Sequence, residues 1–200
     1  MLAFVITSIV IELTPGPNMT WLAVLGATRG RAAALSAVAG IFLGLALAGL
    51  VAALGLTALF DSFPSLLIAL RYAGTLYLFY LAYDAWTDAA QHDAIVAKSN
   101  AAYFTQGFIS NALNAKAYLF YAAILPQFLV GSGNQLQEIA IFTAVYVAVA
   151  TIIHATIAVL AGSISGWLVN SPWTTHIRRA LAIIIALAAC WFFISTGNLK

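Results

Sequence analysis

The stretch ELTPGPN, residues 12–18, interrupts an apolar N-terminal run, and NALNAKA, residues 111–117, interrupts a second apolar run that continues into LPQF, residues 125–128. Apolar residues make up 64% of the chain and charged residues 7%, and the mean hydropathy is +1.00. This composition predicts a protein whose main solvent is lipid. Lipid tolerates a broken helix only where protein or a water-filled cavity covers it. Paired interruptions in two halves are typical of the central binding site of a transporter.

The 200 residues predict one all-α integral membrane domain, residues 1–200, with six transmembrane helices. We expect the spans at residues 1–26, 36–60, 66–86, 104–130, 138–168 and 179–197, with the first and fourth helices broken. The fifth span is long enough to tilt or to end in a turn near Gly162 and Gly166. Gly40, Gly44 and Gly49 are expected to allow close contact between helices.

The two interruptions also align with each other. Setting position 14 against position 114 aligns Leu13–Pro17 with Leu113–Ala117, each in the first span of a three-span half. An odd number of spans in each half requires the halves to be inverted in the membrane. We therefore expect two inverted three-helix repeats, at about residues 1–90 and 100–200. Chance similarity between two apolar sequences is the alternative.

Most of the cationic side chains fall on one side of this six-span arrangement. That side has five, against Arg71 and Lys200 on the other: Arg29, Arg31, Lys98, Arg178 and Arg179. The difference predicts that the five face the cytoplasm of a bacterial inner membrane and that both termini are periplasmic. The formal net charge is only +2, so nucleic acid binding is not expected. No Lys or Arg precedes Arg29, which disfavours a cleaved signal peptide.

The first break predicts exposed backbone groups. Pro15 and Pro17 lack N–H groups, and each ring opposes the carbonyl four residues earlier, so acceptors at about Ile11 and Leu13 are expected to lose their helical partners. Gly16 adds flexibility between them. The helix that resumes offers free N–H groups and partial positive charge to an anion such as a substrate carboxylate. A structural kink satisfied by neighbouring helices is the alternative.

Three ionisable residues are expected deep in the spans: Glu12, Lys116 and His154. Each lies about 15 Å or more from the end of its span, so a partner, a water-filled cavity or a function is expected. Inverted packing would place Glu12 and Lys116 on opposite sides of one cavity that suits a zwitterion. Glu12 is the expected proton carrier, with help from His154. The alternatives are a buried Glu12–Lys116 pair and a His154 that only bonds a carbonyl.

We expect the substrate-binding and proton-coupling residues to gather around the two breaks. They are Glu12, Thr14, Pro15, Gly16, Pro17, Asn18, Asn111, Asn114, Lys116 and His154. The chain has a single cysteine, Cys190, and three scattered histidines, so we expect no metal, no cofactor and no enzyme activity. Export of a divalent metal is disfavoured for the same reason.

Four segments in this order resemble the LysE/RhtB family of amino-acid exporters. They are TPGPN at residues 14–18, RGRAAAL at 29–35, YAGTLYLFYLAYDAW at 72–86 and LNAKAYLFYAAILPQF at 113–128. The resemblance covers nearly the whole chain. It implies a bacterial inner-membrane protein of six helices in two related halves, which exports amino acids or their derivatives using the proton gradient.

The family motifs fall on residues 15–18 and on Asn114 and Lys116, but Ala115 stands where the family usually has proline. We therefore expect the fourth span to depend on Asn111 and Asn114 for its irregularity. One interior Glu and one interior Lys favour a neutral substrate such as threonine or homoserine over lysine. A passive channel or facilitator and an exporter of a cationic amino acid stay open, and so does a homodimer.

Overall fold

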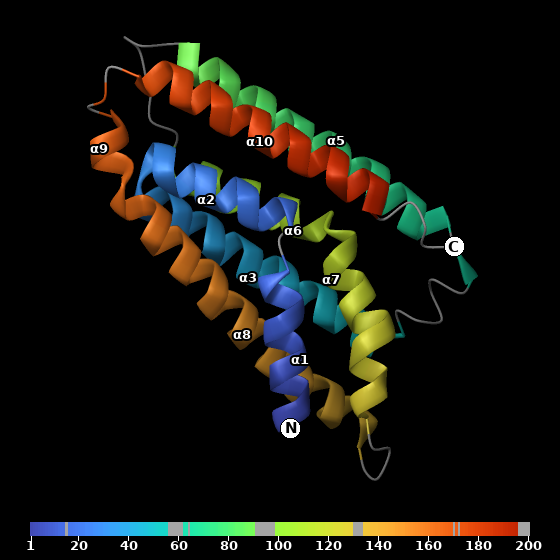
Figure 1. The fold of residues 1–200 in the computed structure, drawn as a ribbon. Coiled ribbons are helices and arrows are strands. Elements are labelled where there is room, and N and C mark those ends of the chain that lie inside the picture. The colour runs from blue at the N-terminus through green and yellow to red at the C-terminus, as the bar shows by residue number, and fades with distance from the viewer. Residues whose placement is uncertain are drawn as a thin grey trace.

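The protein is a bundle of helices, most of which run in about the same direction (Figure 1). The computed structural model describes residues 1–14, 16–55, 62–63, 65–90, 99–129, 134–169, 171 and 173–195, and no strand occurs among them. Within these residues, three segments are long and apolar enough to cross a membrane: α3 (Arg31–Ala53), Gln135–Leu168, and Thr174–Ile194. The bent pair α1 (Leu2–Leu13) and α2 (Pro17–Arg29) makes a fourth if it is counted as one span.

The remaining elements follow the expected spans with shifted ends. They are α5 (Ser65–Ala90), α6 (Asn100–Ala112), α7 (Ala115–Leu119), a π-helical turn (Phe120–Ile124), a 3-10 turn (Leu125–Phe128), α8 (Gln135–Ser163), α9 (Ser165–Val169) and α10 (Thr174–Ser195). α3 begins at Arg31, five residues before the expected start, because Gly30 turns the chain with a φ of 86° directly after α2. The turn expected near Gly162 and Gly166 falls at Ile164.

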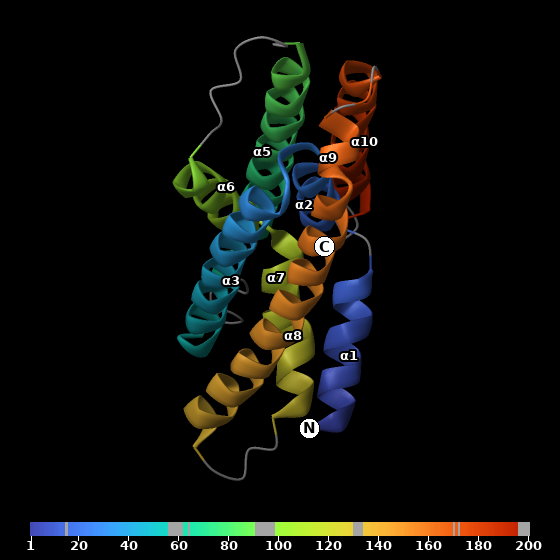
Figure 2. The ribbon, with the colours of Figure 1, turned by 90° about the vertical axis from the view of Figure 1, so that its left-hand side faces the viewer.

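The helices pack in two groups. α3 packs against α6 and α8, and α8 also contacts α1 and α2. α5 and α10 run side by side along one edge of the bundle (Figures 1 and 2). Arg71 of α5 ties this pair together, because its Nε and Nη2 donate to the carbonyl of Phe193 at 3.0 and 2.6 Å and its guanidinium lies 3.9 Å from the Phe193 ring centre.

Glycines let α3 approach its neighbours closely. A Cβ added at Gly40 would overlap the carbonyl oxygen of Phe104 in α6, and one at Gly107 would overlap the carbonyl oxygen of Ala37. A Cβ added at Gly44 would lie only 3.0 Å from the Asn111 side chain. The expectation of close contact at these α3 glycines is therefore confirmed.

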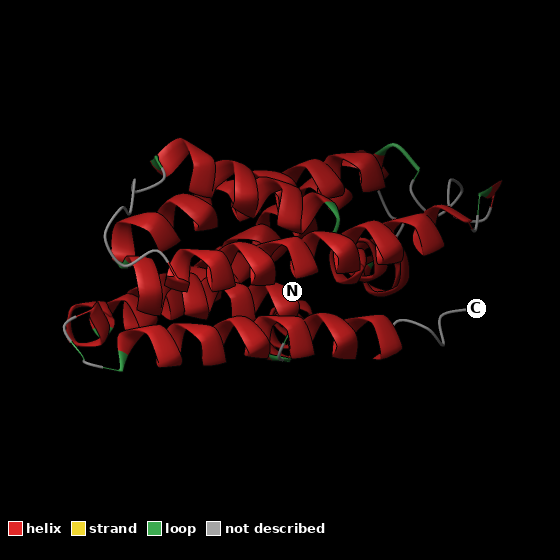
Figure 3. Ribbon diagram, turned by 90° about the horizontal axis from the view of Figure 1, so that it is seen from above, coloured by secondary structure: helices red, strands yellow, loops and turns green. Residues whose placement is uncertain are grey.

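The outward faces of the bundle are apolar. Leu76, Leu160 and Leu187 are 67%, 65% and 62% exposed. Figure 3, viewed from above, shows how little of the described chain lies outside helices. A surface this apolar suits lipid, so the arrangement is that of a multi-pass membrane protein.

Replacing Gly40 by alanine should destabilise the α3–α6 contact, because the added methyl group meets backbone rather than a side chain that can move aside. The expected loss is about 1–3 kcal/mol, read as a clearly lower melting temperature of the purified protein in detergent. Gly166→Ala is the matched control, since nothing lies within 4 Å of a Cβ added there. Equal melting temperatures for the two variants would contradict this packing.

Candidate binding and coupling site

The first break separates α1 from α2. Their axes differ by 64°, and Gly16, with extended backbone (φ −139°), precedes Pro17 at the first position of α2. Pro15 lies outside the described residues. The N–H of Thr14 donates to the carbonyls of Val10 and Ile11, each at 3.2 Å. The expectation that the Ile11 carbonyl lacks a partner is therefore wrong, because the chain closes α1 with a turn before it breaks.

The second break separates α6 from α7. α6 ends at Ala112, and Asn114 caps α7 with its side-chain Oδ1, which accepts a hydrogen bond from the N–H of Lys116 at 3.1 Å. The role expected of Asn114 is confirmed, because its side-chain cap starts the new helix at Ala115. Asn111, the other residue expected to shape this break, instead accepts a hydrogen bond from Asn18 of the first break. Beyond α7 the span continues in the π-helical and 3-10 turns, which sequence patterns did not predict.

The two breaks bond to each other. Lys116 Nζ donates to the carbonyl of Thr14 at 3.1 Å. Ser110 Oγ donates to Asn18 Oδ1 at 2.6 Å, and Asn18 Nδ2 donates to Asn111 Oδ1 at 3.4 Å. The alternative of a direct Glu12–Lys116 ion pair does not describe the structure, because the Lys116 ammonium group donates to a backbone carbonyl instead.

Glu12 is held by α8. It is 5% exposed, and its Oε1 accepts a hydrogen bond from the hydroxyl of Tyr146 at 2.6 Å. His154 Nε2 lies 3.8 Å from Glu12 Oε2. The Tyr146 ring stacks on Phe120 at a centroid distance of 3.7 Å. The side chain that bonds the Glu12 carboxylate therefore also packs against the helical segment that follows the second break.

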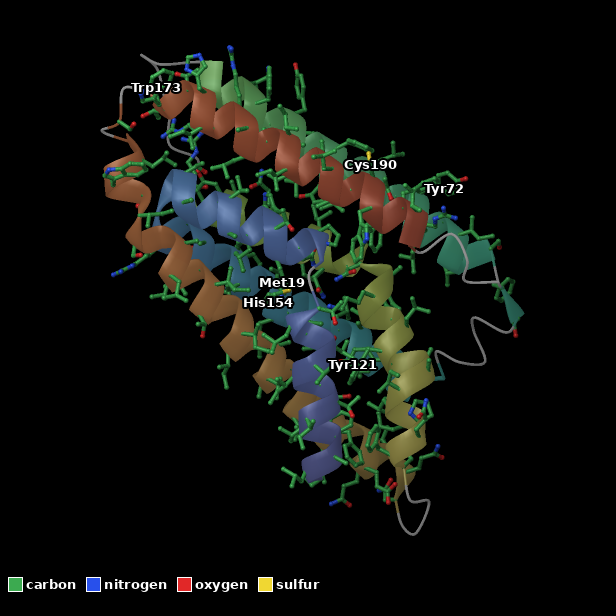
Figure 4. All side chains as sticks on the ribbon, viewed as in Figure 1. Met19, Tyr72, Tyr121, His154, Trp173 and Cys190 are labelled. Carbon is green, nitrogen blue, oxygen red and sulfur yellow. The ribbon has the colours of Figure 1, made fainter. Side chains whose placement is uncertain are left out.

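These residues surround a central cavity of about 20 Å³, which has room for one or two water molecules. It is lined by eight of the ten predicted residues: Glu12, Gly16, Pro17, Asn18, Asn111, Asn114, Lys116 and His154. The labelled Met19 and His154 lie at the level of the bend between α1 and α2 (Figure 4). Thr14 is exposed and its hydroxyl bonds the Val10 carbonyl, so only its backbone takes part.

Sequence reasoning missed four residues here. Met19, Leu45 and Tyr146 line the cavity, and Ser110 bonds Asn18 across the breaks. Tyr146 carried a usable signal: it lies eight residues before His154, about two helical turns, and so near the same face. Within the described part of the chain, no three His, Cys, Asp or Glu side chains group so as to hold a metal ion.

Comparison with known proteins finds efflux proteins and other membrane proteins of similar sequence. A homoserine/homoserine lactone efflux protein of Salmonella typhimurium is 25% identical over 188 residues, covering 92% of this chain and 91% of that protein. An uncharacterised membrane protein of Pseudomonas aeruginosa is 34% identical over 134 residues, covering 63% and 62%. A leucine efflux protein of Salmonella choleraesuis is 30% identical over 130 residues, covering 63% and 61%.

No solved structure matches the protein significantly. The family model of the LysE type translocators matches residues 9–196, a range that includes both breaks and all the lining of the central cavity. The chain therefore belongs to the LysE type translocator family.

Proposed function

We propose that the protein exports amino acids or their derivatives from the cytoplasm across a bacterial inner membrane, in exchange for protons. The observation that carries the proposal is the central cavity between two broken helices, lined by one carboxylate, one ammonium group, one imidazole and three amide side chains. Relatives named for homoserine and leucine efflux support amino acids as the substrate class.

The polar groups of the cavity suit the two charges that all α-amino acids share. The N-terminus of α2 begins at Gly16 without a side-chain cap, so together with Lys116 it offers positive charge to a substrate carboxylate. Lys116 would then release the Thr14 carbonyl that it now bonds. That carbonyl and Glu12 are the acceptors for the substrate ammonium group. A single carboxylate in the lining favours a neutral side chain, as in threonine or homoserine, over a cationic one.

The structure is a closed state in this mechanism, because a cavity of about 20 Å³ cannot hold an amino acid. Binding requires the two breaks to separate. Six spans in two inverted repeats would allow alternating access by rocking one half against the other. The packing of the helices supports such repeats. In the first half, α3 packs on α6, which begins the second half, and in the second half α8 packs on α1 and α2, which begin the first half.

Glu12 is the proposed proton carrier. Its carboxylate is buried between Tyr146 and His154, where a change of charge alters the contacts between α1 and α8. A proton gradient of about 150–200 mV supplies about 3.5–4.6 kcal/mol for each charge moved inward, enough for a substrate gradient of several hundred-fold. One proton per cycle therefore suffices.

The charged end of the bundle gives the proposed orientation. Arg178 Nη2 donates to the Thr28 carbonyl at 3.4 Å, so the start of α10 and the end of α2 lie together, and the N-terminus lies at the opposite end of the bundle (Figure 1). We place this arginine-bearing end in the cytoplasm and both termini in the periplasm. Lys98 and Lys200, which entered the charge count, lie outside the described residues. A homodimer stays a prediction.

Inside-out vesicles with an imposed pH gradient should accumulate one or a few members of a panel of threonine, homoserine, leucine and lysine. Glu12→Gln should abolish accumulation while leaving exchange of the same substrate, because it removes the proposed proton carrier but keeps a polar side chain in place. Glu138→Gln, at the start of α8, is the control and should accumulate normally. Gradient-driven accumulation by Glu12→Gln would disprove the proton-carrier role, and equilibration without accumulation by the wild type would indicate a facilitator.

Lys116→Gln should raise the KM for the transported amino acid about 10–100-fold, because it removes a charge-assisted hydrogen bond of about 1.5–3 kcal/mol. The methyl ester of the same amino acid, which lacks the carboxylate charge, should be a poor substrate for the wild type. Its KM should change little in the variant. Equal effects of the substitution on the acid and the ester would show that Lys116 does not bind the substrate carboxylate.

A further inference from the structure

Aromatic rings from α1, α8 and the second broken span meet in one cluster. We call it the Phe4 cluster, and its members are Phe4 of α1, Phe120 of the π-helical turn, Phe128 of the 3-10 turn and Phe142 of α8. The Phe4 ring meets the other three edge-on, at centroid distances of 5.8, 5.2 and 4.7 Å in that order. Phe4 is 0% exposed and Phe120 is 2% exposed, so these rings fill the space between the three segments.

The Phe4 cluster lies on the side of the central cavity that faces the N-terminal end of the bundle. Phe4 precedes Glu12 by eight residues, which is about two helical turns and about 12 Å along α1. Both are buried residues of α1, and this spacing puts them near the same face of the helix. Figure 4 shows Tyr121, the chain neighbour of Phe120, nearer to the N-terminal end of α1 than His154. A solute that moves from the cavity to that end between these three segments therefore has to pass the cluster.

Tyr146 connects the Phe4 cluster to the carboxylate of the central cavity. It is 1% exposed, its hydroxyl donates to Glu12 at 2.6 Å, and its ring lies within 11° of parallel to the Phe120 ring on which it stacks. Phe120 is also the first residue of the π-helical turn. Such turns are rare, occur frequently at functional sites and are places where helices bend. The span can therefore bend where Phe120 touches both Tyr146 and Phe4.

The strength of the Tyr146–Glu12 bond depends on the charge of the carboxyl group. A hydrogen bond to an ionised carboxylate is about twice as strong as a neutral one. The other titratable side chains near Glu12 make no such bond with it, because His154 Nε2 lies 3.8 Å away and Lys116 and Tyr121 donate to backbone carbonyls. An ionised Glu12 therefore holds Tyr146 in place, and a proton on the carboxylate or a substrate ammonium group beside it weakens that hold.

We propose that the Phe4 cluster is the gate between the central cavity and the periplasm, and that Tyr146 is the positioning residue that keeps it closed while Glu12 is ionised and has no substrate beside it. The proposal rests on the proposed export function and adds to it an outer gate and the residue that controls this gate. Neutralising Glu12, by a proton or by a substrate ammonium group, lets the rings of Phe120 and Phe4 separate. An empty, ionised transporter stays closed to the periplasm, so protons do not enter through it without export of substrate.

The first test measures how fast a cysteine in the central cavity reacts with a membrane-impermeant methanethiosulfonate. In a Cys190→Ser background, Met19→Cys places a thiol in the lining of the cavity. Gln137→Cys, exposed at the start of α8, marks the face of the vesicle toward which the gate opens. With the reagent on that face and no substrate present, the thiol at position 19 should react slowly, and Tyr146→Phe should speed the reaction at least about 10-fold, because a charge-assisted hydrogen bond is lost.

Tyr121→Phe is the matched control for this test. It also removes one hydroxyl from a buried tyrosine, but that hydroxyl donates to the Leu45 carbonyl at 3.1 Å rather than to Glu12. The rate of labelling at position 19 should therefore stay that of the parent protein. Equal rates in Tyr146→Phe and Tyr121→Phe overturn the proposal, because the bond to Glu12 would then have no part in closing the gate.

The second test asks whether the gate responds to the charge of Glu12, which a purely structural role of Tyr146 would not require. The rate at Met19→Cys, divided by the rate at Gln137→Cys at the same pH, should rise as the pH falls through the range in which Glu12 takes up a proton. In Glu12→Gln the ratio should be high at every pH, since the side chain is always neutral. A ratio that is independent of pH in the parent protein overturns the control of the gate by Glu12.

Phe4→Ala keeps the Tyr146–Glu12 bond and serves if Tyr146→Phe does not fold. It removes the ring that the other three contact, so it should also speed labelling at position 19, and an unchanged rate overturns the gate. Failure of the export function is seen separately. A wild type that moves no amino acid overturns export, whereas normal export together with a rate of labelling that none of these substitutions changes overturns only the gate.

Discussion

A helix broken inside lipid must have its loose backbone groups covered, and the rest of this fold follows from that constraint. Thr14 is the clearest case. Its carbonyl, at the open end of α1, is bonded by Lys116 from the other broken span. The first broken span thus takes a backbone partner from the second, so it requires the second beside it. The polar side chains at the centre of the bundle are therefore part of what stabilises the fold, because they cover backbone groups that the breaks expose.

The bonds that close the centre are few and of ordinary strength. Asn18, Asn111 and Ser110 join the breaks through neutral hydrogen bonds, each worth about 0.5–1.5 kcal/mol net. By contrast, the contacts of α3 with α6 involve backbone packed directly against glycine. The bonds between the two breaks are therefore easier to separate than the α3–α6 contact, although both join the first half of the chain to the second.

The sequence predicted the membrane class, the two breaks and the deep polar residues. These features were predictable because polar residues and helix breakers stand out within long apolar segments. Eight of the ten predicted residues line one cavity. Residues such as Tyr146 and Ser110 escaped prediction, since a tyrosine or serine within a span is common and gains meaning only from its neighbours. Helix ends were also less predictable: Gly30 turned the chain so tightly that α3 began five residues early. The functional roles of the lining residues are predictions that the proposed transport measurements address.

The two breaks differ in whether a side chain caps the helix that resumes after them, and this difference suggests which of the two junctions moves. Gly16 and Pro17 leave the start of α2 without a side-chain cap, whereas Asn114 caps α7 with its own side chain. An uncapped start depends on outside partners, while a capped start is satisfied locally. In the proposed mechanism, a substrate anion therefore gains more at α2 than at α7. We therefore expect the α1–α2 junction to be the part of the centre whose energy changes most when substrate binds, and the α6–α7 junction to be the more fixed surface against which it moves.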